Sequence, residues 1–297
     1  MSFFIKRLAV VGVGLIGGSF AQALREQDLV GEVIGVARSQ RTLDKARELG
    51  VIDSGTLDPQ QGVAGAQFVL VAPPVCAIVP TVQQFAPALS RGAVVTDAGS
   101  VKGSIVAPCE QLMPEGCHFV GSHPIAGRER SGVEAAFPAL FQGSRTILTP
   151  TERTAPAALE RVRVAWEACG SQVEVMAADH HDRVLAATSH LPHLMAYNVV
   201  KTLSDLEQDI QAEVFRYAAS GFRDFTRIAS SDPTMWRDIC LENRTAICEV
   251  LQRFRGDLDV LLELVSNSDG EALHDVFARS RATRERVLKE NKILRTP

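Results

Sequence analysis

The sequence has few of the features that mark secreted, membrane-bound or nucleic-acid-binding proteins. Its six cysteines include no CxxC pair and no regular framework, which predicts reduced, mostly buried thiols in a cytoplasmic protein. No run approaches the roughly 18 consecutive apolar residues of a membrane helix, and the first residues lack the apolar stretch and cleavage site of a signal peptide. The net charge of −4 gives no electrostatic footprint for nucleic acid. No HExxH or cysteine-pair pattern is present, so no metal site is expected.

The sequence does contain enough apolar residues for a large core, since 46% of its 297 residues are apolar. This length is typical of about two domains. In the first half, apolar and β-branched segments alternate with helical patterns, which predicts an α/β fold with a doubly wound, mostly parallel sheet in residues 1–176. The predicted strands are residues 8–11, 33–36, 68–71, 93–96, 118–120, 146–148 and 173–176.

Beyond the last predicted strand, the pattern changes. Residues 179–292 contain no convincing strand, and their apolar residues fall at helical spacing. We therefore expect residues 177–297 to form an all-helical domain. Several of its helices carry apolar residues on more than one face, which favours burial against a second copy of the chain. The expected assembly is a homodimer, with a compact monomeric bundle as the alternative.

A glycine-rich turn, GVGLIGGS at residues 12–19, lies between the first predicted strand and a helical stretch. Gly12 lets the chain turn off the strand, Gly14 lets backbone N–H groups approach a pyrophosphate, and Gly17 lets the helix pack on the sheet. A GxGxxG pattern alone is weak, but here its flanking strand and helix are both present. The motif predicts a Rossmann-like dinucleotide site. The residues expected to line this site are Gly12, Gly14, Leu15, Ile16, Gly17, Arg38, Ser39, Pro73 and Ser100.

The end of the second predicted strand bears on which nicotinamide cofactor binds. NAD sites usually have an Asp or Glu there, which accepts hydrogen bonds from the ribose hydroxyls. This chain has no carboxylate at that point and carries Arg38 and Ser39 instead. A guanidinium and a hydroxyl suit the 2′-phosphate of NADP. The sequence therefore favours NADP, with NAD as the alternative if Arg38 is a surface arginine that stacks on adenine.

Two polar motifs follow neighbouring predicted strands. The motif at residues 97–102, DAGSVK, places Ser100 at the carboxyl end of the fourth strand. The motif at residues 121–132, GSHPIAGRERSG, follows the fifth strand and places His123 directly after it. Ligands bind outside the carboxyl ends of such strands, so we expect both side chains at one edge of the sheet. His123 and Ser100 are therefore the predicted catalytic residues. A structural role for a lone histidine is the alternative.

Taken together, these motifs resemble those of the prephenate/arogenate dehydrogenase family of tyrosine biosynthesis. The similarity spans residues 7 to about 240 and continues through HHDRVLAATSHLPH at residues 180–193 and GFRDFTRIA at residues 221–229. It implies oxidative decarboxylation of a cyclohexadienol, either prephenate or arogenate, with hydride transfer to NAD(P). No appended chorismate mutase or regulatory ACT domain is expected. The choice between the two substrates stays open, because Arg128 either favours the extra negative charge of prephenate or faces solvent.

The resemblance also implies roles for individual residues. His123 accepts the proton of the ring hydroxyl, which suits a neutral imidazole near neutral pH. Ser100 orients His123 and the nicotinamide. Arg227 grips a substrate carboxylate through its guanidinium fork. The alternative for Arg227 is an intrahelical pair with Asp224, which is worth only a few tenths of a kcal/mol.

Several further residues at family positions are expected near the substrate. His190 and His193 are spaced i,i+3 and share a helix face with Ser189 alongside. His181 also matches a family histidine but ranks below His193, because twelve residues of straight helix separate the two by about 18 Å. Trp236 lies near the site or is a buried core aromatic, and Glu129 is a candidate gate of the pocket. The predicted substrate-binding residues are Arg227, His193, His190, Ser189, Glu129 and Asp224.

Two other functions remain open from the sequence. A β-hydroxyacid dehydrogenase also combines a Rossmann domain with a helical one, but it typically uses a lysine on an early helix of the second domain. The first lysine of that region here is Lys201. A regulator that binds NADP without turnover is the other alternative. A sensor needs no proton acceptor, so the presence of His123, Ser100 and Arg227 together argues against it.

Overall fold

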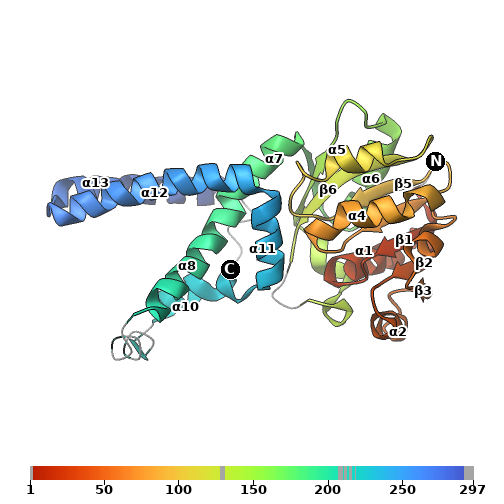
Figure 1. Cartoon of the computed structure of the whole chain (residues 1–297), viewed down its shortest axis with the longest axis horizontal. Coiled ribbons are helices and arrows are strands. Elements are labelled where there is room, and N and C mark those ends of the chain that lie inside the picture. Colours follow the sequence, from red (N-terminus) through yellow and green to blue (C-terminus); the bar gives the residue numbers. More distant parts are fainter. Residues whose placement is uncertain are drawn as a thin grey trace. The chain divides into compact units, whose positions relative to one another are not determined.

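The computed structural model describes residues 3–127, 131–206 and 219–290, together with residues 210, 213, 216 and 217. Contacts divide the chain into two compact units, Met1–Arg244 and Thr245–Pro297. The first unit contains a single sheet and the helices around and after it (Figure 1). The second unit contains two helices, α12 (Arg244–Ser266) and α13 (Gly270–Glu290). The first residue of α12, Arg244, still belongs to the first unit.

The described strands form one eight-stranded sheet in the order β3-β2-β1-β4-β5-β6-β7-β8. All neighbouring strands are parallel except β6 and β7. The first six strands have the order of a dinucleotide-binding Rossmann sheet, which confirms the predicted α/β fold. The strands are β1 (Ile5–Val11), β2 (Val30–Val36), β3 (Ser54–Thr56), β4 (Phe68–Val71), β5 (Val94–Asp97), β6 (His118–Ile125), β7 (Arg145–Thr149) and β8 (Gln172–Val175).

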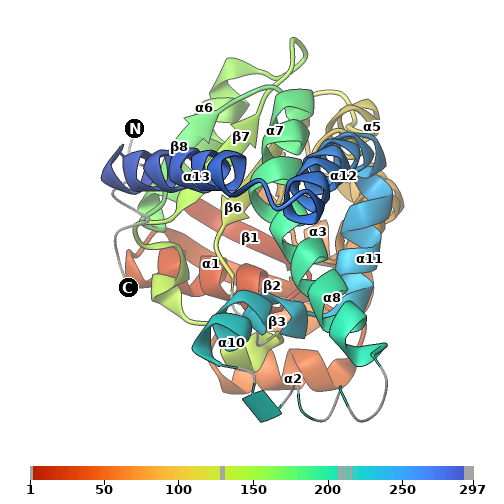
Figure 2. The same ribbon diagram turned by 90° about the vertical axis from the view of Figure 1, so that its left-hand side faces the viewer.

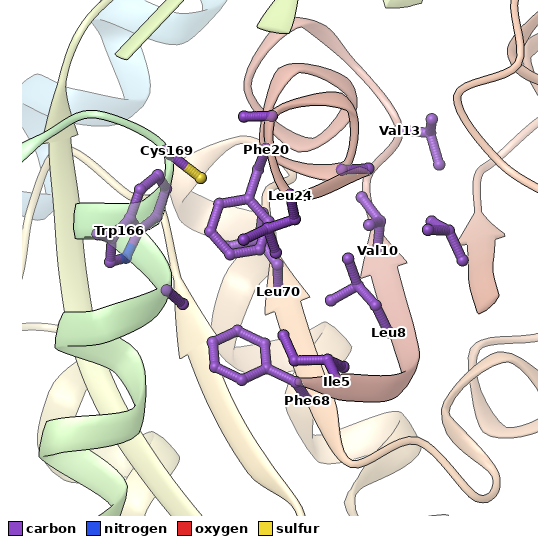
Figure 3. Close-up of a cluster of buried hydrophobic side chains, with 14 of the residues drawn as sticks. Ile5, Leu8, Val10, Val13, Phe20, Leu24, Phe68, Leu70, Trp166 and Cys169 are labelled. Atoms are coloured by element: carbon purple, nitrogen blue, oxygen red, sulfur yellow. The ribbon is translucent and has the colours of Figure 1, made fainter. Parts of the chain in front are cut away.

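Helices α1 (Leu15–Glu26) and α6 (Pro156–Ala168) cover one face of this sheet. Phe20 of α1 lies edge-on to Trp166 of α6 with ring centroids 4.7 Å apart, and it stacks on Phe68 of β4 at 6.0 Å (Figure 3). All three side chains are fully buried. Burying such large aromatic surfaces stabilises the packing of both helices on the sheet. This core therefore fixes the position of α1, whose first turn follows the glycine-rich motif.

The strands are buried on their other face as well. Val69 and Val71 alternate with the core residues of β4, so they face the opposite side of the sheet, and neither is exposed. Burial on both faces is what a doubly wound parallel sheet requires. The remaining helices of this sheet region are α2 (Gln40–Glu48), α3 (Pro59–Val63), α4 (Val75–Phe85) and α5 (Val106–Gln111).

After β8, the described residues contain only helices, as predicted. Helix α7 (Ala178–Leu185) continues through a π-helical turn (Ala186–His190) into α8 (Leu191–Ser204), and the three segments form one rod (Figures 1 and 2). Then follow α10 (Ser220–Thr226), a 3₁₀ turn (Arg227–Ser230) and α11 (Pro233–Glu242), which packs against α4. The domain boundary at residue 176 stays a prediction. In the described part of the chain, no helix has both the length and the apolar character of a membrane span.

Most predicted strands begin and end within three residues of the observed ones, and two strands differ by more than this. The short β3 (Ser54–Thr56) went unpredicted because Ser54, Gly55 and Thr56 carry no apolar pattern. Strand β6 runs to Ile125 rather than ending at residue 120. Its parallel pairing with β5 ends at Val120, and from Gly121 onward it pairs with β7 instead. His123 therefore lies inside a strand, opposite Ile147, and not in the loop after it.

Candidate active site

The glycine-rich turn between β1 and α1 has the geometry that a dinucleotide needs. Gly12 has a φ of +100°, and a Cβ at this position would lie 2.6 Å from the carbonyl carbon of Ala72. A Cβ on Gly17 would lie 2.4 Å from the oxygen of Gly12, so only glycine lets α1 approach the strand this closely. In contrast, a Cβ on Gly14 would meet nothing within 4 Å. Two glycines are therefore required by packing, and the third borders open space.

Open space at Gly14 lies where a phosphate group would sit. Gly14 caps α1 without a side-chain hydrogen bond, and the first turn contains no acidic residue. The N–H groups of Leu15 and Ile16 are in this first turn, where helices leave donors unpaired and the helix dipole favours anions. Pro73 lies beside the turn, because its nitrogen is 2.8 Å from the position of a Gly12 Cβ. These residues fit the pyrophosphate of a dinucleotide.

The end of β2 gives its two predicted cofactor residues different environments. The hydroxyl of Ser39 caps α2 by accepting a hydrogen bond from the Thr42 N–H, at a distance of 3.3 Å. Arg38 is exposed and forms no ion pair with the described residues. Nearby, the carboxylate of Asp44 accepts hydrogen bonds from Gln40 and Arg47. The Arg38 guanidinium is thus available to an anion, while Ser39 also has a structural role.

A second group of polar residues lies around strand β6. Here His123 is hydrogen-bonded to a second histidine. Its Nδ1 lies 2.8 Å from Nε2 of His181, which is on α7. The Nδ1 of His181 lies in turn 2.8 Å from a carboxylate oxygen of Asp182. His123 is partly exposed, whereas His181 is fully buried. Among the described residues, no hydrogen bond joins His123 to Ser100, so the partner that orients His123 is His181.

Asp182 anchors this chain of hydrogen bonds to the loop that carries Ser100. Its two carboxylate oxygens accept hydrogen bonds from the backbone N–H groups of Lys102 and Gly103, at 2.8 and 2.7 Å. Asp182 is 7% exposed. Ser100 is partly buried just before this contact. The start of the helical region and the end of β5 are therefore tied together at the site.

A buried ion pair lies beneath the same loop. Lys102 and Asp97 are both fully buried, and the ammonium group donates to the Asp97 carboxylate and, at 2.9 Å, to the carbonyl oxygen of Ser122. The N–H groups of Gly99 and Ser122 also donate to Asp97, at 2.8 and 3.0 Å. Buried charges are tolerated only when they are paired and hydrogen-bonded in this way. This network fixes the carboxyl end of β5 relative to the middle of β6.

On the helical side, two histidines contact one tryptophan of α11. The ring of His193 stacks on Trp236 with centroids 3.9 Å apart, and His190 lies edge-on to it at 5.9 Å. His193 donates through Nδ1 to the carbonyl oxygen of Ser189 at 2.9 Å, so Nε2 is its remaining polar atom. The predicted common face of His190 and His193 is confirmed by their contact with one ring. Trp236 is 6% exposed, and its indole N–H has no hydrogen-bond partner in the described part of the chain.

His190 is almost completely buried and lies deeper than His193. Its Nδ1 accepts a hydrogen bond from the side-chain amide of Asn243 at 3.2 Å. The same amide donates to the backbone carbonyl of Asp182 at 2.9 Å. These contacts give His190 a structural role within the described residues. They also link the rings at Trp236 to the pair formed by His123 and His181.

The remaining predicted substrate residues lie on and beside α10. Arg227 is exposed at the start of the 3₁₀ turn. Desolvation lowers the pKa of His193, and the positive charge of Arg227 adds to this shift. Asp224 is exposed and forms an ion pair with Arg223 at 3.2 Å. Glu129 and Arg128 lie outside the described residues. Of His190 and His193, it is His193 on which the charge of Arg227 acts.

Burial keeps the histidines of this site neutral. Desolvation, followed by unfavourable electrostatic interactions with His181, Lys102 and His190, holds the pKa of His123 well below 6.5. Desolvation also lowers the pKa of His181, although Asp182 opposes the shift. A neutral histidine beside a dinucleotide site can accept a proton. The described residues contain no cluster of three or more metal-ligating side chains.

Sequence reasoning missed four residues of this arrangement or ranked them low. His181 was placed below His193, although it directly contacts His123. Asp97, Lys102 and Asp182 were not assigned to the site. A usable signal was present, because Asp182 lies on the same helix face as the buried Leu185 and Ala186, where an unpaired carboxylate would be costly. Finding its partner required the tertiary contact.

The fold and this site define a dinucleotide-dependent oxidoreductase whose sheet edge carries a histidine with a lowered pKa. The comparisons give the family. The nucleotide-binding domain of prephenate dehydrogenase matches residues 20–175, and the dimerization domain of prephenate dehydrogenase matches residues 177–279. The chain belongs to the prephenate dehydrogenase family.

Individual relatives agree with this assignment. A cyclohexadienyl dehydrogenase of Zymomonas mobilis is 39% identical over 94% of this chain and 95% of its own length. The crystal structure of prephenate dehydrogenase from A. aeolicus, in complex with hydroxyphenyl propionate and NAD+, has a TM-score of 0.90 and 37% identity over 97% of this chain and 100% of that one. Synechocystis arogenate dehydrogenase has a TM-score of 0.81 and 33% identity, covering 94% and 99% of the two chains. The cofactor of this chain is therefore a nicotinamide dinucleotide, and neither alternative function is favoured.

Proposed function

We propose that this protein catalyses the oxidative decarboxylation of prephenate or arogenate, to 4-hydroxyphenylpyruvate or tyrosine respectively. The observation that carries the proposal is the orientation of His123: its Nδ1 is engaged by His181, so Nε2 is the nitrogen left to meet a substrate. The named relatives act on these two compounds, and the A. aeolicus structure holds a hydroxyphenyl compound. The two substrates differ only in an oxo versus an ammonium group on the side chain.

In this reaction, His123 accepts the proton of the ring hydroxyl as the carbon that bears it loses a hydride. The bound nicotinamide supplies the hydride acceptor. The bond to the ring carboxylate then breaks, its electron pair completes the aromatic ring, and carbon dioxide leaves. His123 returns its proton to the phenolate oxygen, so the proton count balances. Because aromatisation drives the reaction, the chain needs to supply little more than positioning and one neutral base.

Cationic and neutral donors on the helical side would hold the two carboxylates of the substrate. Arg227 provides a guanidinium fork for a carboxylate, and its charge acts on the adjacent His193. His193 presents Nε2, because Nδ1 is bound to Ser189. Glu129 and Asp224 complete the proposed substrate residues as predicted from the family motif.

The direct test is an assay with NADP or NAD and each substrate, following the absorbance band of the reduced nicotinamide. Turnover of prephenate, arogenate or both supports the function, and the ratio of the kcat/KM values defines the preferred substrate. An absence of reduction and of carbon dioxide release with all four combinations would reject it.

For the cofactor, we propose NADP, bound through Arg38. The proposal is supported by the exposed Arg38 guanidinium, which forms no ion pair with any described residue, and by the absence of a carboxylate at the end of β2. NAD, the cofactor named for the A. aeolicus structure, is the alternative. Arg38→Asp should shift the kcat/KM ratio toward NAD, because it removes the phosphate partner and supplies a ribose acceptor. A wild-type protein that prefers NAD would contradict the proposal.

We also propose that the protein is a homodimer built by its second unit. On α12, Leu258, Leu262 and Val265 are 47%, 65% and 57% exposed at helical spacing, and such an apolar stripe is typical of an interface. The name of the family domain that covers residues 177–279 is consistent with this. Sedimentation equilibrium should give twice the mass of one chain, and a single-chain mass at micromolar concentration would contradict the proposal.

A further inference from the structure

A chain of hydrogen bonds runs from His123 through His181 to Asp182. His123 contacts His181 at 2.8 Å, and His181 contacts Asp182 at 2.8 Å, each through a different ring nitrogen of His181. The rings of the two histidines are 5.1 Å apart and inclined at 66°. Both partners lie on α7, whereas His123 is on β6. The proton acceptor and its support therefore come from different parts of the fold.

The position of each proton in this chain follows from the carboxylate at its end. Asp182 receives three donors, from the Lys102 and Gly103 N–H groups and from His181, so it acts only as an acceptor. His181 must then carry its proton on Nδ1. As a neutral ring it has a lone pair on Nε2, so it accepts the Nδ1 proton of His123. The basic nitrogen of His123 is consequently Nε2.

When His123 binds a proton, its ring becomes positively charged. Among the charged groups around His123, Asp182 is the carboxylate that offsets this charge. Lys102 faces His123 from the loop after β5, but its ammonium is paired with Asp97. His190 faces it from the π-helical turn and is neutral. His181 transmits the field of Asp182 through a hydrogen bond. Within the described part of the chain, a positive charge on His123 is thus connected by hydrogen bonds to one carboxylate, that of Asp182.

We propose that His181 and Asp182 are positioning residues for the reaction: they hold His123 in the tautomer with the proton on Nδ1 and stabilise the imidazolium that forms when Nε2 accepts the substrate proton. The proposal rests on the proposed role of His123 as the proton acceptor. It assigns to α7 a part in the chemical step, in addition to its place in the helical region.

The first test compares substitutions of His181. His181→Leu removes the acceptor of the Nδ1 proton, and loss of the correct tautomer should lower kcat by roughly 10²–10⁴-fold. KM and the Kd of the cofactor should stay within about twofold, because neither ligand is held by His181. His181→Gln places a carbonyl oxygen near the former Nε2 and should recover at least about tenfold of the loss. His180→Leu, at the exposed neighbouring histidine, is the matched control and should leave kcat unchanged.

A double-mutant cycle separates a positioning role from a purely structural one. If His181 acts through His123, then adding His181→Leu to a His123→Asn protein should lower kcat no further. An additional loss as large as in the wild-type background would overturn the proposal. The cycle also keeps the two hypotheses apart: near-normal turnover of His123→Asn alone rejects the proton acceptor, whereas near-normal turnover of His181→Leu alone rejects only its support.

A spectroscopic measurement tests the tautomer without any substitution. In the wild-type protein labelled with ¹⁵N on its seven histidines, the ring of His123 should show a protonated Nδ1 and an unprotonated Nε2 near neutral pH. The resonance is assigned by its disappearance in His123→Asn. A protonated Nε2 would contradict the proposal even if His181→Leu fails to fold.

Discussion

Acid should destabilise this protein through His190, and the size of the effect can be worked out from its surroundings. His190 is 1% exposed, and its Nδ1 accepts a hydrogen bond from Asn243. Protonation would place a positive charge on a buried ring. It would also turn Nδ1 into a donor, which would then face the donating amide group of Asn243. Burial and, to a smaller extent, the positive charges of His181 and His193 lower its pKa from 6.5 to about 4, against the opposing pull of Asp182.

The sign follows from comparing the folded and unfolded chains. Between pH 6.5 and about 4, the unfolded chain binds a proton at His190 that the folded chain does not, so lowering the pH in this window favours unfolding. One pKa unit corresponds to about 1.4 kcal/mol, so the free energy of unfolding should fall by about 3 kcal/mol across the window. Above pH 6.5 both states are neutral at His190, and the full contribution is retained.

The assay is urea unfolding at a series of pH values from 7.5 to 4, in the wild type and in His190→Asn. An asparagine at this position does not titrate, and its side-chain oxygen can accept the hydrogen bond from Asn243. The variant is expected to start from a lower free energy of unfolding and to lose about 3 kcal/mol less than the wild type on acidification. The exposed His180, replaced by asparagine, is the control and should keep the wild-type slope. Parallel pH dependences for wild type and His190→Asn would refute this reasoning.

Four further outcomes are expected. Lys102→Met leaves the fully buried Asp97 without its cation and should lower the free energy of unfolding by about 3–5 kcal/mol in urea titrations; a loss under about 1 kcal/mol would contradict a paired role. Gly12→Ala forces a side chain into φ +100° and against backbone atoms, so both the melting temperature and cofactor affinity should fall, and unchanged values would reject the close approach. His123→Asn should reduce kcat by about 10²–10⁴-fold in steady-state assays, with cofactor binding retained in fluorescence titrations, and near-normal turnover would remove it as the base. Arg227→Ala should raise the substrate KM by about 10–100-fold with a smaller change in kcat; an unchanged KM would exclude its carboxylate contact.

The helical region shows where local reasoning succeeds and where it stops. The i,i+3 spacing of His190 and His193 predicted a common face, and both rings contact Trp236. The same helical geometry gave His181 a low rank, because its distance was measured from His193 and not from His123. Helix spacing says which residues of one helix are neighbours, but not which strand the helix meets.

Strand β6 gives a second example. Its apolar run ends at Val120, so the pattern ended the strand there, yet the chain remains extended through His123 to Ile125. The cause is the antiparallel partner β7, which supplies hydrogen bonds to residues 121–125 from a distant part of the sequence. Polar residues remain in a strand when a neighbouring strand satisfies their backbone groups.

The sequence by itself determined the dinucleotide turn and the order of strands and helices, because the backbone demands of Gly12 and Gly17 and the spacing of apolar residues are written in contiguous segments. Only the tertiary structure decided what supports the reacting histidine. His123 and His181 are 58 positions apart, and Lys102 and Asp182 are 80 apart. Such contacts depend on how α7 packs against the sheet edge, and the free energy of that packing comes from the whole fold rather than from any local pattern.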